Sequence, residues 1–167
     1  GVAVVCVLAF VLVGHAQTTD DSAWQRFLDW LKAAPAANGP LEILQGYQKS
    51  LIADRRLPAE AGREMGVVMR LMRDRNDAWP LMFDRIYASA TPNFNTQPNG
   101  LLMAAIEGRP AGRALDVGMG QGRNAVALAE KGWTVTGFDM SAEGLAVARA
   151  QAARAGVAVT AIQDTEE

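Results

Sequence analysis

Apolar residues recur along the first half of the chain at the three- and four-residue spacing that is typical of amphipathic helices. Ser22 and Gln25 form a capping-box pattern that opens the first of these segments. The apolar face of this segment carries Trp24, Phe27, Leu28 and Leu31. The pattern predicts helices at residues 23–34, 41–55, 59–75 and 81–87.

We therefore predict a helical extension over residues 20–90. Its third helix carries Met65, Met69 and Met72 on one side, and we expect this stripe to pack in the core rather than to bind a ligand. Residues 90–98 contain two prolines, two asparagines and two threonines, which indicates a loop. This loop is a candidate domain boundary and also a candidate active-site flap.

From residue 112 onward, short apolar strands alternate with helices. The predicted strands are residues 114–117, 133–138 and 157–162, and the predicted helices are residues 123–131 and 142–155. Ser141 is a suitable N-cap for the second of these helices, and Gly132 and Gly156 follow the two helix ends. The alternation predicts an α/β fold with a parallel sheet and right-handed crossovers, whose ligands bind at the carboxyl ends of the strands.

Alternating glycines follow the first strand, and an acidic residue lies at or near the end of each strand. Gly118, Gly120 and Gly122 would let the backbone approach a ligand where any Cβ would collide. The helix that starts there presents free N–H groups, which favour a phosphate or carboxylate. The acids are Asp116, Asp139 and Asp164, and Asp139 is placed to accept hydrogen bonds from ribose hydroxyls. Taken alone, this pattern fits any cofactor that contains a nucleoside.

Two details separate this loop from that of dinucleotide-binding folds. The spacing is Gly-x-Gly-x-Gly, and an acid, Asp116, precedes the first glycine by two positions. Over about residues 93–164, around ALDVGMGQGRNAVALAEKGWTVTGFDMS, the sequence resembles the class I S-adenosylmethionine-dependent methyltransferases. Gly122-Arg123-Asn124 and Pro98-Asn99 are similar to the tellurite-resistance and thiopurine-type branch of that family.

The resemblance implies a Rossmann-like fold and a role for each matching residue. The loop with Asp116, Gly118, Gly120 and Gly122 would hold the methionine part of S-adenosylmethionine. Asp139 would bind the ribose, Met140 would pack on the adenine, and Asp164 would meet the adenine amino group. Arg123 and Asn124 are interpreted as first-turn helix residues rather than as substrate contacts. Tyr87 and Asn99 are either contacts for the amino-acid end of the cofactor or residues of the core and loop.

The implied activity is methyl transfer to a small-molecule acceptor by in-line displacement, which depends mainly on positioning and desolvation. No catalytic residue is identified. The resemblance also implies a seven-stranded sheet, so we expect residues 91–167 to be the N-terminal βαβαβ half of a methyltransferase domain, inactive by itself. The alternatives are an NAD(P)-dependent oxidoreductase and a non-catalytic, exported module with the same fold.

The apolar run at residues 2–13, VAVVCVLAFVLV, would span only about 18 Å as a helix, which is too short to cross a bilayer. With Gly14-His15-Ala16 resembling a cleavage site, it predicts a signal peptide or membrane anchor over residues 1–16; a buried strand or short core helix is the alternative. This indicates export or anchoring, whereas the supply of S-adenosylmethionine indicates the cytoplasm.

The composition argues against two classes of site. The chain of 167 residues has a formal net charge of -2 and no basic block, which argues against binding to nucleic-acid phosphates. One cysteine and one histidine cannot form a Cys/His zinc site, so we expect no metal.

Overall fold

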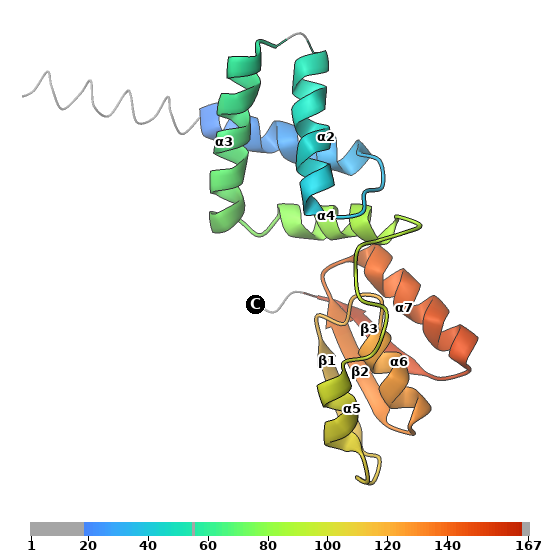
Figure 1. Cartoon of the computed structure of the whole chain (residues 1–167). Coiled ribbons are helices and arrows are strands. Elements are labelled where there is room, and N and C mark those ends of the chain that lie inside the picture. The colour runs from blue at the N-terminus through green and yellow to red at the C-terminus, as the bar shows by residue number, and fades with distance from the viewer. Residues whose placement is uncertain (1–18, 55, 165–167) are drawn as a thin grey trace, which may run out of the picture. The chain divides into compact units, whose positions relative to one another are not determined.

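The computed structural model describes residues 19–54 and 56–164, which belong to two compact units (Figure 1). The first unit contains the described residues up to Ala34 together with Leu41–Ala78, and the second contains Pro35–Pro40 and the chain from Trp79 onward. The predicted signal peptide or anchor at residues 1–16 lies outside the described residues. No helix within residues 19–54 and 56–164 is long and apolar enough to span a membrane.

The first unit is built from helices. These are residues 19–33, α2 (Pro40–Ala53) and α3 (Pro58–Asp74). The core contains the apolar face expected of the first helix together with residues of α2 and α3: Trp24, Phe27, Leu28, Leu31, Ile43, Tyr47, Leu51, Ala61 and Val68. The rings of Phe27 and Tyr47 have centroids 5.0 Å apart, so aromatic contacts join the first helix to α2.

Two details of this unit differ from the sequence-based expectations. The first helix already includes residue 19, so Ser22 lies inside it, and Asp20 forms an ion pair with Arg70 from α3 at 2.5 Å. The methionine stripe is not the core face of α3, because Met69 is 58% exposed. The core face of α3 instead carries Glu64, whose carboxylate is buried and forms ion pairs with Arg26 and Arg56.

The second unit contains the α/β fold. Its elements are α4 (Ala78–Tyr87), α5 (Gly100–Ile106), β1 (Arg113–Val117), α6 (Arg123–Glu130), β2 (Thr134–Asp139), α7 (Ala142–Ala155) and β3 (Val159–Gln163). The three strands form a parallel sheet in the order β1-β2-β3, with Val117 beside Phe138 and Phe138 beside Ile162. This confirms the predicted α/β class with a βαβαβ unit, whereas α5 was not expected from the sequence.

One face of the sheet is covered by helices, and its packing fixes the position of the strand ends. The core contains residues of α6, β2, α7 and the glycine loop: Met119, Ala125, Leu128, Val135, Leu145 and Ala148. Leu102, Met103 and Ile106 from α5 pack against it. On the opposite face Leu115 is 64% exposed. All three strands run in the same direction, so their carboxyl ends share one edge of the sheet.

The division between the units falls after Ala78, so the remainder of α4 belongs to the α/β unit together with the loop that follows it. The expected boundary was the loop at residues 90–98. The side chain of Asp84 on α4 explains this arrangement, because its Oδ1 accepts a hydrogen bond from the Ser141 hydroxyl at 2.7 Å and from the Glu143 N–H at 3.1 Å. Asp84 thereby joins α4 to the N-terminus of α7.

Candidate functional site

The turn between β1 and α6 depends on its three glycines. Gly118, Gly120 and Gly122 have φ angles of 66°, 51° and 80°, in the left-handed region that favours glycine. The Met119 N–H donates to the Phe138 carbonyl at 3.0 Å, so the turn is attached to the end of β2. Hydrogen bonds of its own backbone therefore hold the turn at the carboxyl ends of the strands.

Asp139, the last residue of β2, holds this turn in place. The N–H of Gly120 donates to its Oδ2 at 2.8 Å, and the N–H of Ser141 donates to its Oδ1 at 2.8 Å. Each carboxylate oxygen can accept a second hydrogen bond, so the side chain can bind two further donors. Ser141 also has the predicted capping role, since its hydroxyl accepts from the Gly144 N–H at 3.0 Å.

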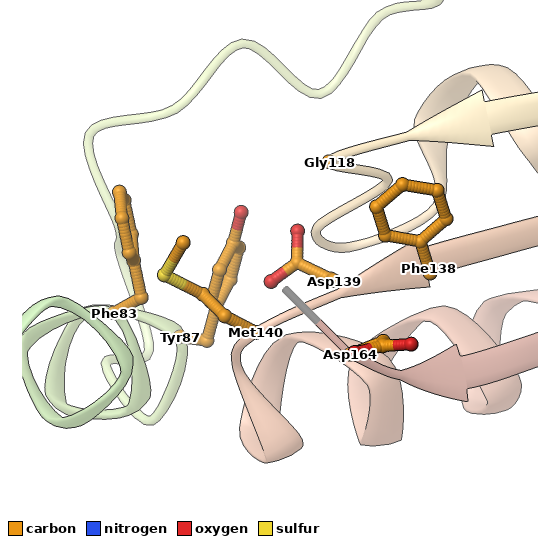
Figure 2. Close-up of a pocket in the computed structure, with 7 residues that line it drawn as sticks. All are labelled: Phe83, Tyr87, Gly118, Phe138, Asp139, Met140 and Asp164. Atoms are coloured by element: carbon orange, nitrogen blue, oxygen red, sulfur yellow. The ribbon is translucent and has the colours of Figure 1, made fainter. Parts of the chain in front are cut away.

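A cavity of about 210 Å³ opens at the carboxyl ends of the strands (Figure 2). Its lining combines three aromatic rings, two acids, a glycine and a methionine: Phe83, Tyr87, Gly118, Phe138, Asp139, Met140 and Asp164. A second cavity of about 230 Å³ is lined by residues of the glycine turn and of the loop after α4: Tyr87, Phe94, Asn95, Gly118, Met119, Gly120, Gln121 and Arg123. Both linings include Tyr87 and Gly118, so the two cavities are neighbours.

Asp116 lies in β1, two residues before the turn. Its Oδ2 is buried and has no hydrogen-bond partner among the described residues. Burial raises the pKa of the Asp116 carboxyl, while the Ala125 N–H and the charge of Arg123 act in the opposite direction. An unpartnered buried carboxylate oxygen favours a nearby positive charge or hydrogen-bond donor, such as an ammonium group.

The loop predicted as a boundary or flap is attached to the start of α6 by side-chain contacts. The Gln121 amide donates to the Asn95 carbonyl at 3.1 Å, and the Arg123 guanidinium donates to the Gln97 carbonyl at 2.6 Å. The side chain of Asn124 accepts from the Asn99 N–H at 2.9 Å. Arg123 and Asn124 thus lie in the first turn of α6, as expected, and Asn99 caps α5.

The structure brings together four of the residues that the sequence singled out, namely Gly118, Asp139, Met140 and Asp164, around the first cavity. Gly120 lines the second cavity, and neither lining includes Asp116 or Gly122. Sequence reasoning missed Phe83, Phe94 and Phe138, and it left Tyr87 undecided. Their apolar rings resemble any core residue in the sequence, and only the tertiary fold places them beside the acids. No group of three or more acidic, histidine or cysteine side chains in the described segments could hold a metal ion.

Comparison with known proteins identifies a family match for the segment that begins in β1. Residues 114–167 match the family model described as a methyltransferase domain. Among curated proteins, the ubiquinone biosynthesis O-methyltransferase of Pectobacterium carotovorum is 46% identical over 68 residues, which are 41% of this chain and 28% of the relative. The enzyme of the same name from Klebsiella pneumoniae is 49% identical over 55 residues, covering 33% of this chain and 23% of the relative. The chain therefore spans about a quarter of the length of these relatives.

Among solved structures, a SAM-dependent methyltransferase from Geobacter sulfurreducens in complex with S-adenosyl-L-homocysteine is similar, with 34% identity and a TM-score of 0.41. The match covers 49% of this chain and 35% of that chain. The family match confirms the resemblance to methyltransferases for residues 114–167. The parallel βαβαβ sheet agrees with the Rossmann-like fold that this resemblance implies.

Proposed function

Taking residues 114–167 as part of a methyltransferase domain, we propose that the α/β unit binds S-adenosylmethionine and that the protein transfers its methyl group to a small molecule. The single observation that carries this proposal is the cavity in which Gly118, Asp139, Met140 and Asp164 meet. A nucleoside needs hydrogen-bond acceptors for its ribose and an apolar surface for its base, and this lining offers both.

The residues of the site could contact the adenine, the ribose and the amino-acid end of this cofactor. The two unused acceptor positions of Asp139 would receive the ribose hydroxyls, with Met140 against the adenine and Asp164 at its amino group. The second cavity, beside the glycine turn, would hold the amino-acid end. The carboxylate of Asp116, with its unpartnered Oδ2, would supply negative charge toward the ammonium group.

When bound, the cofactor supplies an electrophilic methyl group on a positively charged sulfur. The residues described here would bind and orient it and keep water away from the sulfur. Positioning of this kind supplies most of the acceleration for a displacement that needs little acid–base chemistry. The matching relatives are named O-methyltransferases, so hydroxylated small molecules are the first acceptors to assay.

Isothermal titration calorimetry of the purified protein with S-adenosylmethionine, S-adenosylhomocysteine and NADH tests the proposal. We expect the first two to bind. Asp139→Ala should weaken S-adenosylmethionine binding roughly 10- to 100-fold, because it removes charge-assisted hydrogen bonds to the ribose. Asp29→Asn is the matched control, since it removes an exposed carboxylate of the helical unit and should leave the affinity unchanged.

Because Asp139 also holds the glycine turn, each variant needs a thermal melt beside the titration. A folded Asp139→Ala variant with unchanged affinity would refute the assigned role of Asp139. Binding of NADH instead of S-adenosylmethionine would favour an oxidoreductase. Binding of none of the three ligands would favour a non-catalytic module.

A further inference from the structure

Three aromatic rings from α4 and the loop after it form a surface beside the two cavities, which we call the aromatic wall: Phe83, Tyr87 and Phe94. The ring centroids of Tyr87 and Phe94 lie 5.0 Å apart, and Phe83 lies 6.4 Å from Tyr87 and 6.3 Å from Phe94. These separations are within the range of favourable aromatic pairs. The aromatic wall precedes residues 114–167, so the matched family segment does not include it.

Two glycines make room for the central ring of the aromatic wall. A Cβ on Gly120 would lie 2.1 Å from the Tyr87 hydroxyl oxygen, and a Cβ on Gly144 would lie 2.9 Å from Cδ2 and Cε2 of the Tyr87 ring. Both distances are shorter than real Cβ contacts, so Tyr87 packs directly on the backbone of the glycine turn and of α7. Its orientation is therefore fixed by elements of the cofactor site.

Tyr87 presents a neutral side chain to both cavities. Burial, together with the charge of Asp139, raises the pKa of Tyr87 to about 12, although Arg123 acts in the opposite direction. In the view of Figure 2, Tyr87 and Phe83 lie on one side of the cavity and Phe138 on the other.

The aromatic wall contributes residues to both cavities. Phe83 lines the cavity that contains Asp139 and Asp164, Phe94 lines the cavity at the glycine turn, and Tyr87 lines both. In S-adenosylmethionine the sulfur connects the ribose to the amino-acid chain. A cofactor with its ribose at Asp139 and its amino acid at the glycine turn would therefore place its sulfur between the two, near Tyr87, which lines both cavities.

We propose that Tyr87, supported by Phe94, faces the sulfonium and makes the site prefer the positively charged cofactor to its neutral demethylated product. This inference rests on the proposed function. The faces of aromatic rings attract cations, and the attraction is stronger when water is excluded. S-adenosylhomocysteine has a neutral thioether at the same place and gains no such attraction. The aromatic wall thus favours binding of the substrate form and release of the product.

The ratio of the two affinities, measured by isothermal titration calorimetry, tests the proposal. Tyr87→Leu keeps an apolar side chain but removes the ring, and we expect it to weaken S-adenosylmethionine binding roughly 3- to 20-fold. It should change S-adenosylhomocysteine binding less than about twofold. Tyr87→Phe keeps the ring and should preserve the ratio, and Phe94→Leu should lower it by a smaller factor.

Trp79→Leu is the matched control, because its ring lies on α4 at 6.1 Å from Phe83 but lines neither cavity. It should leave both affinities unchanged. Partial unfolding of a variant lowers the stoichiometry of binding and not the affinity ratio, so the ratio remains readable. Equal weakening of both ligands by Tyr87→Leu would overturn the inference and leave the proposed function standing. Failure of the unmodified protein to bind either ligand would overturn both.

Discussion

Asp116 lowers the stability of the protein when no ligand is bound. Its Oδ2 is buried without a partner in the described part of the chain, and burial raises the pKa of the carboxyl. A carboxyl whose pKa is raised in the folded state favours folding when protonated, below its ordinary pKa, and this contribution is lost as the pH rises. At neutral pH the ionised form therefore destabilises the free protein, which is common among residues retained for function.

We predict that Asp116→Asn stabilises the protein without cofactor by roughly 1 kcal/mol at pH 7, because a neutral amide is less costly to bury than a carboxylate. The gain should shrink at pH 4, where the wild-type carboxyl takes up its proton. Urea denaturation of both proteins at the two pH values measures this. Asp29→Asn, at an exposed position, should change the unfolding free energy by less than about 0.5 kcal/mol. A less stable Asp116→Asn variant at pH 7 would contradict the prediction.

The sequence predicted the polar half of the candidate site, left Tyr87 undecided and missed the other aromatic residues. Asp139 and Asp164 were found because both acids follow parallel strands, and such strand ends share one edge of a sheet. Tyr87 reaches the same cavity from α4, a helix far from these strands in the sequence. The spacing of apolar residues does not predict that Tyr87 lies beside these strand ends. Gly120 and Gly144 make room for its side chain, but only the structure shows that they contact it.

At the scale of elements, α7 and α4 approach each other at a glycine. A helical glycine normally costs about 1 kcal/mol relative to alanine, so replacing Gly144 by alanine would be expected to stabilise α7. A Cβ at this position would, however, lie 2.9 Å from the Tyr87 ring and 3.3 Å from the Ser141 hydroxyl oxygen. The close packing of α4 on α7 therefore requires glycine here.

We predict that Gly144→Ala destabilises the α/β unit by about 1–3 kcal/mol, because the added methyl overpacks the contact with Tyr87. Gly66→Ala in α3 is the matched control, since a Cβ there meets nothing within 4 Å. It should instead stabilise its helix by about 0.5–1 kcal/mol. Thermal melts of both variants measure these effects. Combining Gly144→Ala with Tyr87→Leu should recover part of the loss, and equal stabilisation by both alanine variants would contradict the prediction.

Element prediction succeeded where periodicity was long and ended at a recognisable cap. α7 begins after Ser141 and is followed by Gly156 in the left-handed conformation, as expected. α5 was missed because its seven residues are too few to show a period, although Asn99 caps it. The first helix was predicted to begin after Ser22, but it already includes residue 19. A capping-box pattern does not exclude an earlier start. Tertiary ion pairs of Asp20 and Asp21 with α3 and its C-cap Arg75 accompany the additional residues.

At the scale of the whole molecule, each unit buries its own core. In the helical unit, Glu64 is the group that makes stability depend on pH. Burial disfavours its charged form, but hydrogen bonds from Arg26 and Tyr47 and the charge of Arg56 outweigh this and hold the pKa of Glu64 below its ordinary value. A carboxyl with a lowered pKa contributes stability that is complete above its ordinary pKa and is lost as the pH falls through the folded value.

We therefore predict two calorimetric transitions that respond to different variables. Lowering the pH from 7 to 3 should lower the transition temperature of the helical unit. Glu64→Gln should reduce this dependence on pH and should destabilise the helical unit at pH 7. S-adenosylmethionine at about 100 times its Kd should raise the transition of the α/β unit by roughly 10 °C, since binding at that level adds about 2.7 kcal/mol. It should not move the other transition. Differential scanning calorimetry distinguishes this from a single transition that shifts with both pH and ligand, which would mean that the two units unfold as one.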